Sequence, residues 1–185
     1  STGPADFTLE VEAHRDGSLL TIVTANRQGV MAELAGAIAL AGLEIRSART
    51  VTLGDAAVSL LEVSRADVDA TWLRERLRPA LAGEIDLASR LELKPNPDGA
   101  GSRVRLLDQV FQTATLLEVR AHDRRGLVWT VCHAITSGGM SIRSAHMSTY
   151  GSEARDVFYV VDADGNALDD ASGARLRDHV AAALD

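Results

Sequence analysis

The sequence is organised around the segment His122-Asp123-Arg124-Arg125-Gly126-Leu127-Val128-Trp129. Strand-forming residues precede it at positions 115–121, and apolar residues at helical spacing follow it at Leu127, Val131 and Ile135. The segment is therefore predicted to join a strand to a helix. Its glycine permits a ligand to approach the backbone closely, and the first turn of a helix has N–H groups without partners, which suit an anion.

A second copy of this arrangement lies 97 positions earlier, since Gly29 corresponds to Gly126 (126 minus 29). There Asn26-Arg27-Gln28-Gly29-Val30 follows a predicted strand at 19–24 and opens a predicted helix. The correspondence continues without a gap, because Ile45-Arg46-Ser47-Ala48 reappears as Ile142-Arg143-Ser144-Ala145. An identity of four residues in register with the glycines indicates a true internal repeat.

The repeat divides the 185 residues into two predicted domains, 1–95 and 103–185. Between them, residues 96–102 have the proline and glycine density of a linker. Each domain is long enough for a modest core. A composition with 46% hydrophobic and 24% charged residues is typical of globular proteins.

Charge and cysteine content exclude several classes of function. A formal net charge of −7 disfavours nucleic acid as a partner, because phosphate binding needs concentrated Lys and Arg. Cys132 is the only cysteine, so neither a disulfide framework nor a thiolate metal cluster is expected. No apolar run approaches the roughly 20 residues that span a bilayer, and no signal peptide is recognisable. We therefore expect no membrane partner and a cytoplasmic location.

Each repeat is predicted to follow the order β-β-α-β-β-α. In the first repeat the expected strands are 7–12, 19–24, 45–52 and 57–64, and the expected helices are 30–41 and 70–82, the latter capped by Asp69. In the second repeat the expected strands are 104–110, 116–120, 142–149 and 155–161, and the expected helices are 127–137 and a last one that begins at Asp170 or Ser172 and runs through Leu184. An extra strand is expected at 87–93. The strand 104–110 is predicted to lie beside 116–120, where a ferredoxin-like unit has its final strand.

The second repeat also contains the segments Ser144-Ala145-His146-Met147-Ser148-Thr149-Tyr150-Gly151 and Arg155-Asp156-Val157-Phe158-Tyr159-Val160. Together with the segment 122–129 they resemble the ACT domain, a small βαββαβ module that binds amino acids in regulated enzymes. The resemblance is closer still to the C-terminal ACT pair of the bifunctional PII-modifying nucleotidyltransferases. It is strong over residues 115–161 and looser over 19–63.

The resemblance implies an α+β fold of two ferredoxin-like ACT domains, each an antiparallel sheet with two helices on one face. It also implies a regulatory region that binds L-glutamine and allosterically controls a longer parent enzyme, which adds uridylyl or adenylyl groups to the PII signal protein and removes them. The implied partners are L-glutamine, the catalytic domains of the parent chain and, indirectly, PII. The resemblance implies no cofactor in this chain and Mg²⁺ in the catalytic region of the parent.

Two alternatives stay open: a stand-alone tandem ACT regulator that binds another amino acid, and an interaction or dimerisation module that binds no ligand. The chain has no Ser/His/Asp or Cys/His set and no paired metal-binding aspartates, so no catalytic residue is predicted. The doublet His122-Asp123 is similar to that of metal-dependent phosphohydrolases. No further ligands at suitable spacing accompany it, and no metal site is predicted.

The predicted ligand-binding residues lie in the two turns, in the first turns of the following helices and in the two Ile-Arg-Ser-Ala segments. They are Asn26, Arg27, Gly29, Val30, Met31 and Ser47 in the first repeat, and Asp123, Arg124, Gly126, Leu127, Val128 and Ser144 in the second. Asp123 can pair with an α-ammonium group while helix N–H groups hold the α-carboxylate. The alternative role for Asp123 is that of a helix N-cap. Asn26 keeps the hydrogen-bonding geometry of an aspartate but lacks its charge.

The two Ile-Arg-Ser-Ala segments are predicted to be edge strands, whose unpaired backbone groups need a partner. Pairing the two edges would join the repeats side by side in one sheet and bring both turns to the interface. Pairing between chains, in a homodimer, is the competing arrangement. A third alternative is an edge that faces solvent and is guarded by arginine.

Overall fold

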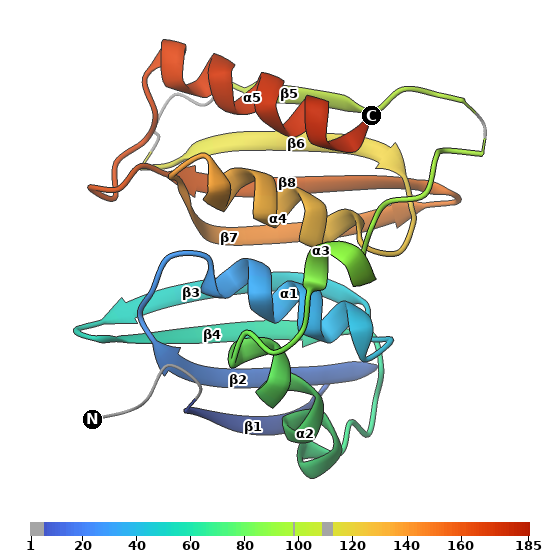
Figure 1. Ribbon diagram of the computed structural model, residues 1–185, viewed down its shortest axis with the longest axis vertical. Helices are drawn as coiled ribbons and strands as arrows, with labels where there is room; N and C mark the ends of the chain where they lie inside the picture. Colours follow the sequence, from blue (N-terminus) through green and yellow to red (C-terminus); the bar gives the residue numbers. More distant parts are fainter. Residues whose placement is uncertain (1–5, 98, 109–112) are drawn as a thin grey trace.

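The computed structural model describes residues 6–97, 99–108 and 113–185. Both repeats contribute to one eight-stranded antiparallel sheet with the strand order β1-β2-β4-β3-β7-β8-β6-β5 (Figure 1). The first repeat comprises β1 (Phe7–His14), β2 (Gly17–Ala25), α1 (Val30–Leu40), β3 (Ile45–Leu53), β4 (Ala56–Val63), α2 (Ala70–Leu81) and α3 (Leu87–Arg90). The second comprises β5 (Arg103–Leu107), β6 (Thr115–His122), α4 (Leu127–Ser137), β7 (Ser141–Tyr150), β8 (Glu153–Val161) and α5 (Asp170–Leu184). The predicted α+β class is confirmed.

The outer strand of each repeat precedes its ferredoxin-like core in the sequence. Strand β5 pairs with β6 at the place predicted for it, and β1 occupies the equivalent place beside β2. Strand β5 ends at Leu107, residue 108 is not part of it, and residues 109–110 of the predicted strand lie outside the described residues. Apart from the additional helix α3 of the first repeat, both repeats have the same order of elements and the same sheet topology.

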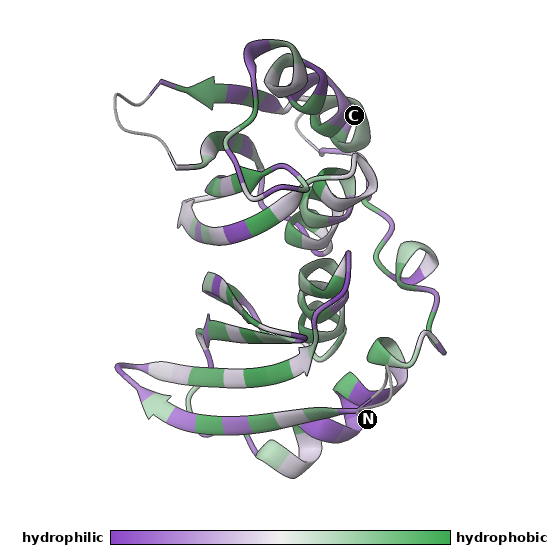
Figure 2. Ribbon diagram, turned by 90° about the vertical axis from the view of Figure 1, so that its left-hand side faces the viewer, coloured by the Kyte–Doolittle hydropathy of each residue, from purple (hydrophilic) through white to green (hydrophobic). Residues whose placement is uncertain are grey.

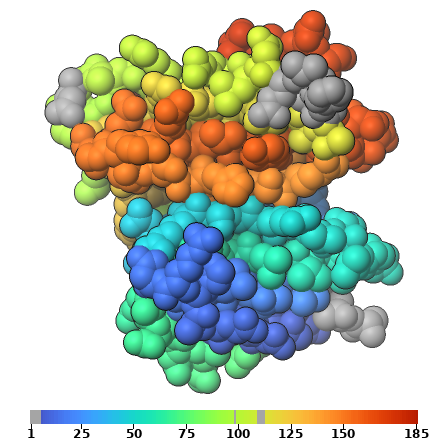
Figure 3. Space-filling model, turned by 180° about the vertical axis from the view of Figure 1, so that it is seen from behind, coloured from blue at the N-terminus to red at the C-terminus, as the bar shows by residue number. Residues whose placement is uncertain are grey.

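The repeats are joined through their inner edges, as the near-identical segments predicted. Strand β3 pairs with β7 so that Ala48 lies opposite Ala145 and Ser47 opposite His146. The ladder consists of three residue pairs, the third of which is Arg49 opposite Ser144. The predicted side-by-side arrangement within one chain is confirmed. The space-filling view from behind shows the two repeats meeting along this seam (Figure 3).

The helices lie on one face of the sheet, and none of the described helices lies on the other face (Figure 2). The predicted apolar stripes face the sheet: Leu73, Leu77 and Leu81 of α2, and Leu176, Val180 and Leu184 of α5, are buried. Helices α1 and α4 pack against each other across the seam. At Gly36 of α1 an added Cβ would lie 2.5 Å from Trp129, so the absent side chain allows this contact. No described helix is long and apolar enough to cross a membrane.

An aspartate residue caps the second helix of each repeat. Asp69 caps α2 as predicted, since its side chain accepts a hydrogen bond from the backbone N–H of Trp72 (2.7 Å). The prediction that the last helix begins at Asp170 or Ser172 is confirmed, since Asp170 is the first residue of α5. Asp169 is the cap of α5, because its side chain reaches the N–H of Ser172 at 2.7 Å.

The predicted strand at 87–93 is wrong, because this segment forms the short helix α3 and a following extended stretch. Asp86 accepts hydrogen bonds from the backbone N–H and the hydroxyl of Ser89, which favours a helical turn over a strand. The place that an extra strand would take in the sheet is already held by β1. The segment instead passes over the second repeat, where Leu91 is buried.

Candidate functional site

Two equivalent turns connect the first helix of each repeat to the sheet. Turn 1 (residues 26–29) follows β2, and turn 2 (residues 123–126) follows β6. The backbone N–H of Asn26 donates to the carbonyl of Asp55 at 2.8 Å, and that of Asp123 donates to the carbonyl of Ser152 at 2.7 Å. Each turn is therefore fixed to the neighbouring β-hairpin, and its first residue has the same backbone environment in both repeats.

The helix that follows each turn begins at a glycine in the left-handed region, Gly29 with φ 82° and Gly126 with φ 88°. No side chain caps either helix. The N-cap role that was the alternative for Asp123 is therefore wrong. The first N–H of each helix donates within its turn, that of Val30 to the carbonyl of Arg27 (3.4 Å) and that of Leu127 to the carbonyl of Arg124 (3.1 Å). The next N–H groups of each first turn have no earlier helical carbonyl to bond and are positioned to bind an anion.

Both turns open into cavities between the repeats. Pocket 1, about 1030 Å³, is bordered by turn 1, the start of α1, strand β3, and the end of α4 with the start of β7 from the other repeat. Pocket 2, about 420 Å³, is bordered by turn 2, the start of α4, strands β7 and β8, and the end of α1 with residues 42–45 from the first repeat. Each pocket thus combines a helix start of one repeat with a helix end of the other. Cavities of this size accommodate small ligands.

All twelve predicted ligand-binding residues line one of the two pockets. Pocket 1 contains Asn26, Arg27, Gly29, Val30, Met31, Ser47 and Ser144. Pocket 2 contains Asp123, Arg124, Gly126, Leu127 and Val128. Ser144 of the second repeat borders pocket 1 together with turn 1, and Ser47 of the first repeat borders the same pocket and not pocket 2.

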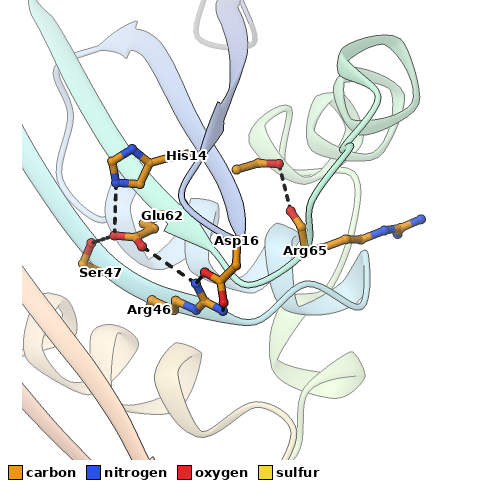
Figure 4. Close-up of polar contacts among 7 residues, drawn as sticks. His14, Asp16, Arg46, Ser47, Glu62 and Arg65 are labelled. Atoms are coloured by element: carbon orange, nitrogen blue, oxygen red, sulfur yellow. Dashed lines mark hydrogen bonds and ion pairs between the residues drawn. The ribbon is translucent and has the colours of Figure 1, made fainter.

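Ser47 belongs to a polar cluster of the first repeat. Its hydroxyl donates to the carboxylate of Glu62 at 3.4 Å, and His14 approaches the same carboxylate at 3.8 Å (Figure 4). Arg46 pairs with Asp16 in the turn between β1 and β2. These contacts connect strand β3 to its neighbours, so that the Ser47 hydroxyl already has a partner within its own repeat.

The two predicted site arginines bind the ends of helices. Arg27 donates to the carbonyl of Leu81 at the end of α2 (3.2 Å) and pairs with Glu33. Arg124 donates to the carbonyl of Leu184 at the end of α5 (2.9 Å) and to that of Lys94 (2.8 Å). A cation at a helix C-terminus satisfies orphan carbonyls and complements the helix dipole. Both guanidinium groups therefore fasten a turn to the second helix of its own repeat.

The equivalent glycines have different surroundings. A Cβ at Gly126 would lie 2.5 Å from the carbonyl oxygen of Leu91, whereas a Cβ at Gly29 would meet nothing within 4 Å. The close backbone approach at Gly126 is thus made by the segment after α3. At turn 1 the seam is instead bridged by Gln28, whose amide donates to the carbonyls of Thr136 (3.1 Å) and Met140 (3.0 Å).

Pocket 2 also contains Asp156, a residue that the sequence analysis assigned no role. It lies on β8 and is only 2% exposed. Burial raises its pKa to about 7, a hydrogen bond from the backbone N–H of Ser148 lowers it, and the negative charges of Asp123 and Glu44 raise it further. The signal in the sequence was a single acidic residue on the core-facing side of an apolar strand. In the described part of the chain, no group of three or more His, Cys, Asp or Glu side chains is placed to hold a metal ion.

The fold and the pockets define a class of protein. Two ferredoxin-like units joined edge to edge, with helix N-termini directed into pockets at their interface, form a tandem ACT-type fold. No family model matches the chain. The aspartate kinase structure from Synechocystis is similar over 79% of this chain and 24% of its own length, with 17% identity and a TM-score of 0.39.

Curated relatives identify the enzymes to which this region is related. The chain is 30% identical to a bifunctional uridylyltransferase/uridylyl-removing enzyme from Rhodospirillum rubrum, over 97% of the chain and 21% of that protein. It is 35% identical to the enzyme of the same name from Streptomyces coelicolor, over 82% of the chain and 20% of that protein. These matches confirm the resemblance predicted from the sequence. The chain is related to one segment of the bifunctional uridylyltransferase/uridylyl-removing enzymes and spans about a fifth of their length.

Proposed function

We propose that this chain is an amino-acid-sensing region that binds L-glutamine and controls the nucleotidyl-adding and nucleotidyl-removing activities of a parent enzyme. The observation that carries the proposal is the pair of helix N-termini that open, without side-chain caps, into pockets between the repeats. An α-carboxylate fits the N–H groups of such a turn. The relatives named above carry both activities in their names, which favours this parent over a stand-alone regulator.

The location of the pockets offers a route for regulation. Each pocket is bordered by both repeats, so a bound ligand would stabilise one relative orientation of the two repeats over others. The partners of the proposed region are L-glutamine, the Mg²⁺-dependent catalytic domains of the parent chain and, through them, the PII signal protein. The proposed parent acts in the cytoplasm in nitrogen regulation. A homodimer through other surfaces is compatible with this proposal, because β3 and β7 are already paired within the chain.

Thermal unfolding of the purified chain tests the proposal. At 100 times its dissociation constant, L-glutamine should add about 2.7 kcal/mol of stability, which corresponds to a rise in Tm of roughly 5 to 10 °C. L-Glutamate tests whether binding requires the side-chain amide, and D-glutamine tests whether it requires the L configuration at the α-carbon. A rise with another amino acid instead of L-glutamine would favour the stand-alone regulator. The absence of any rise with millimolar amino acids would favour the interaction module and overturn the proposal.

A further inference from the structure

The carboxyl group of Asp156 is buried in the wall of pocket 2 without a cationic partner. It accepts a hydrogen bond from the backbone N–H of Ser148, and within the described residues it forms no ion pair with Lys, Arg or His. The strand that carries it is otherwise apolar on this face, with Ala154 and Phe158 as its buried neighbours. A buried, unpaired carboxylate is costly, so its presence needs an explanation outside the packing of the core.

The charged groups that face Asp156 do not supply the missing cation. Asp123 from turn 2 and Glu44 from the loop between α1 and β3 are acidic, and both line the same pocket. The thiol of Cys132 on α4 is neutral, since burial raises its pKa to about 12. Arg125 also lines the pocket, but the charges that shift the pKa of Asp156 are those of the two acidic residues, and both raise it.

The remaining arginine of turn 2 is also committed elsewhere. Arg124 donates from both terminal nitrogens to carbonyl groups, those of Lys94 and Leu184. Pocket 2 therefore combines a negative wall on β8 with a helix N-terminus on α4 that offers N–H donors. A ligand that carries an ammonium group and a carboxylate on the same carbon atom matches both features at once.

The first repeat shows that the fold does not require this carboxyl group. The residue 97 positions earlier is Ser59, which is fully buried on β4 and whose hydroxyl lies 3.1 Å from that of Thr50. The position of Thr50 corresponds to Met147, which lines pocket 2 and cannot bond a carboxylate in the same way. The second repeat thus has an acid where the first has a satisfied hydroxyl pair.

We propose that Asp156, together with Asp123, receives the α-ammonium group of an amino acid bound in pocket 2, while the first-turn N–H groups of α4 receive its α-carboxylate. This inference rests on the proposed function and assigns the ammonium-binding residues of one of its two pockets. The arriving cation stabilises the ionised form of Asp156, so binding releases the proton that the buried carboxyl otherwise holds. Affinity for pocket 2 accordingly falls as the pH falls.

Calorimetric titration at pH 6 and pH 8 with L-glutamine, L-alanine and glutaramic acid tests the assignment. L-Alanine keeps the α-ammonium and α-carboxylate groups without the amide, and glutaramic acid is glutamine without its ammonium group. Because Asp156 has a pKa of about 7 when no ligand is bound, the ionised fraction, and with it the affinity, should drop roughly tenfold between pH 8 and pH 6. Asp156→Asn should remove this pH dependence and weaken binding. The matched variant Ser59→Ala should keep the pH dependence and the affinity of the wild type.

A ¹³C NMR titration of the Asp156 carboxyl group reads the site without a substitution. L-Glutamine should lower the pKa of Asp156, and glutaramic acid should not. If L-alanine lowers this pKa and L-glutamine does not, the assignment of pocket 2 stands and the choice of glutamine is overturned. If L-glutamine binds without changing the pKa of Asp156, and Asp156→Asn binds it equally well, the assignment is overturned and the proposed function stands. If neither amino acid changes this pKa, pocket 2 is not an ammonium site.

Discussion

The two pockets are formed by equivalent backbone elements, but their side chains differ in charge. Three positions that carry a carboxylate in pocket 2 carry a neutral side chain at the equivalent place in the other repeat: Asp123 corresponds to Asn26, Asp156 to Ser59 and Glu44 to Ser141. The strands and helices that present these residues have the same order and pairing in both repeats. Because the neutral set forms the same fold, the acidic set is not needed for folding. At these three positions the copies therefore differ in charge and not in fold.

The comparison extends to how each turn is held. Turn 2 is covered by the segment after α3, with Leu91 against Gly126, and turn 1 is bonded across the seam by Gln28. The covering segment belongs to the first repeat, whereas the carbonyl groups that Gln28 binds belong to the second. The two equivalent turns therefore have non-equivalent surroundings.

The largest difference is expected for alanine at the two glycines. Gly126→Ala places a Cβ 2.5 Å from the Leu91 carbonyl and also strains a backbone with φ 88°. Strain of about 1 to 2 kcal/mol and overpacking of about 1 to 3 kcal/mol give a total loss of roughly 2 to 5 kcal/mol. Gly29→Ala causes the same backbone strain, but its Cβ enters open space. It should therefore lose only the stability that the strain costs. Urea denaturation measures both losses, and equal values would show that the Leu91 contact relaxes at no cost.

The next effect concerns stability and pH. The folded chain holds the proton of Asp156 with a pKa of about 7, against an ordinary value of 3.8, so its stability should decline as the pH rises through this interval. Asp156→Asn removes the ionisation and should stabilise the ligand-free protein at pH 8, by on the order of 4 kcal/mol. At pH 4 the variant and the wild type should be nearly equally stable. Chemical denaturation at both pH values checks this, and a gain that is the same at pH 4 and pH 8 would contradict it.

The local elements were largely predictable because their causes are local. Strand alternation, the Asp69 cap and the leucine stripe of α2 are readable within a few residues of sequence, and the identical edge segments predicted the pairing of β3 with β7. The prediction of a strand at 87–93 was wrong because the apolar residues there fit a strand as well as a helix. What excludes a strand is the sheet edge, which β1 already occupies. Short apolar runs leave helix and strand undecided, and tertiary contacts make the choice.

The candidate site was predictable in position but not in chemistry. The duplicated turns located both pockets, since a helix start between two paired edges must face the interface. Arg27 and Arg124 line these pockets, yet their guanidinium groups bind helix ends that lie 54 and 60 residues away in the sequence. Asp156 was overlooked because its burial depends on α4 and on turn 2. The role of a charged side chain depends on such residues, which are distant in the sequence and do not appear in a local sequence pattern.

The smallest effect isolates the first residue of each turn. Asp123 and Asn26 are both exposed, and both have their backbone N–H bonded to the neighbouring hairpin, so an exchange between them alters charge with little change in geometry. A charge-assisted hydrogen bond to an α-ammonium group is worth about twice a neutral one of roughly 1 kcal/mol, so Asp123→Asn should weaken pocket 2 by about fivefold. The reverse change, Asn26→Asp, should strengthen pocket 1 by a similar factor. Calorimetry at pH 8 with L-glutamine measures both steps, because at that pH Asp156 is mostly ionised and contributes equally to wild type and variant. If Asp123→Asn leaves both affinities unchanged while Asp156→Asn weakens one, the ammonium group is held by the strand alone and turn 2 serves only to present the N–H groups of α4.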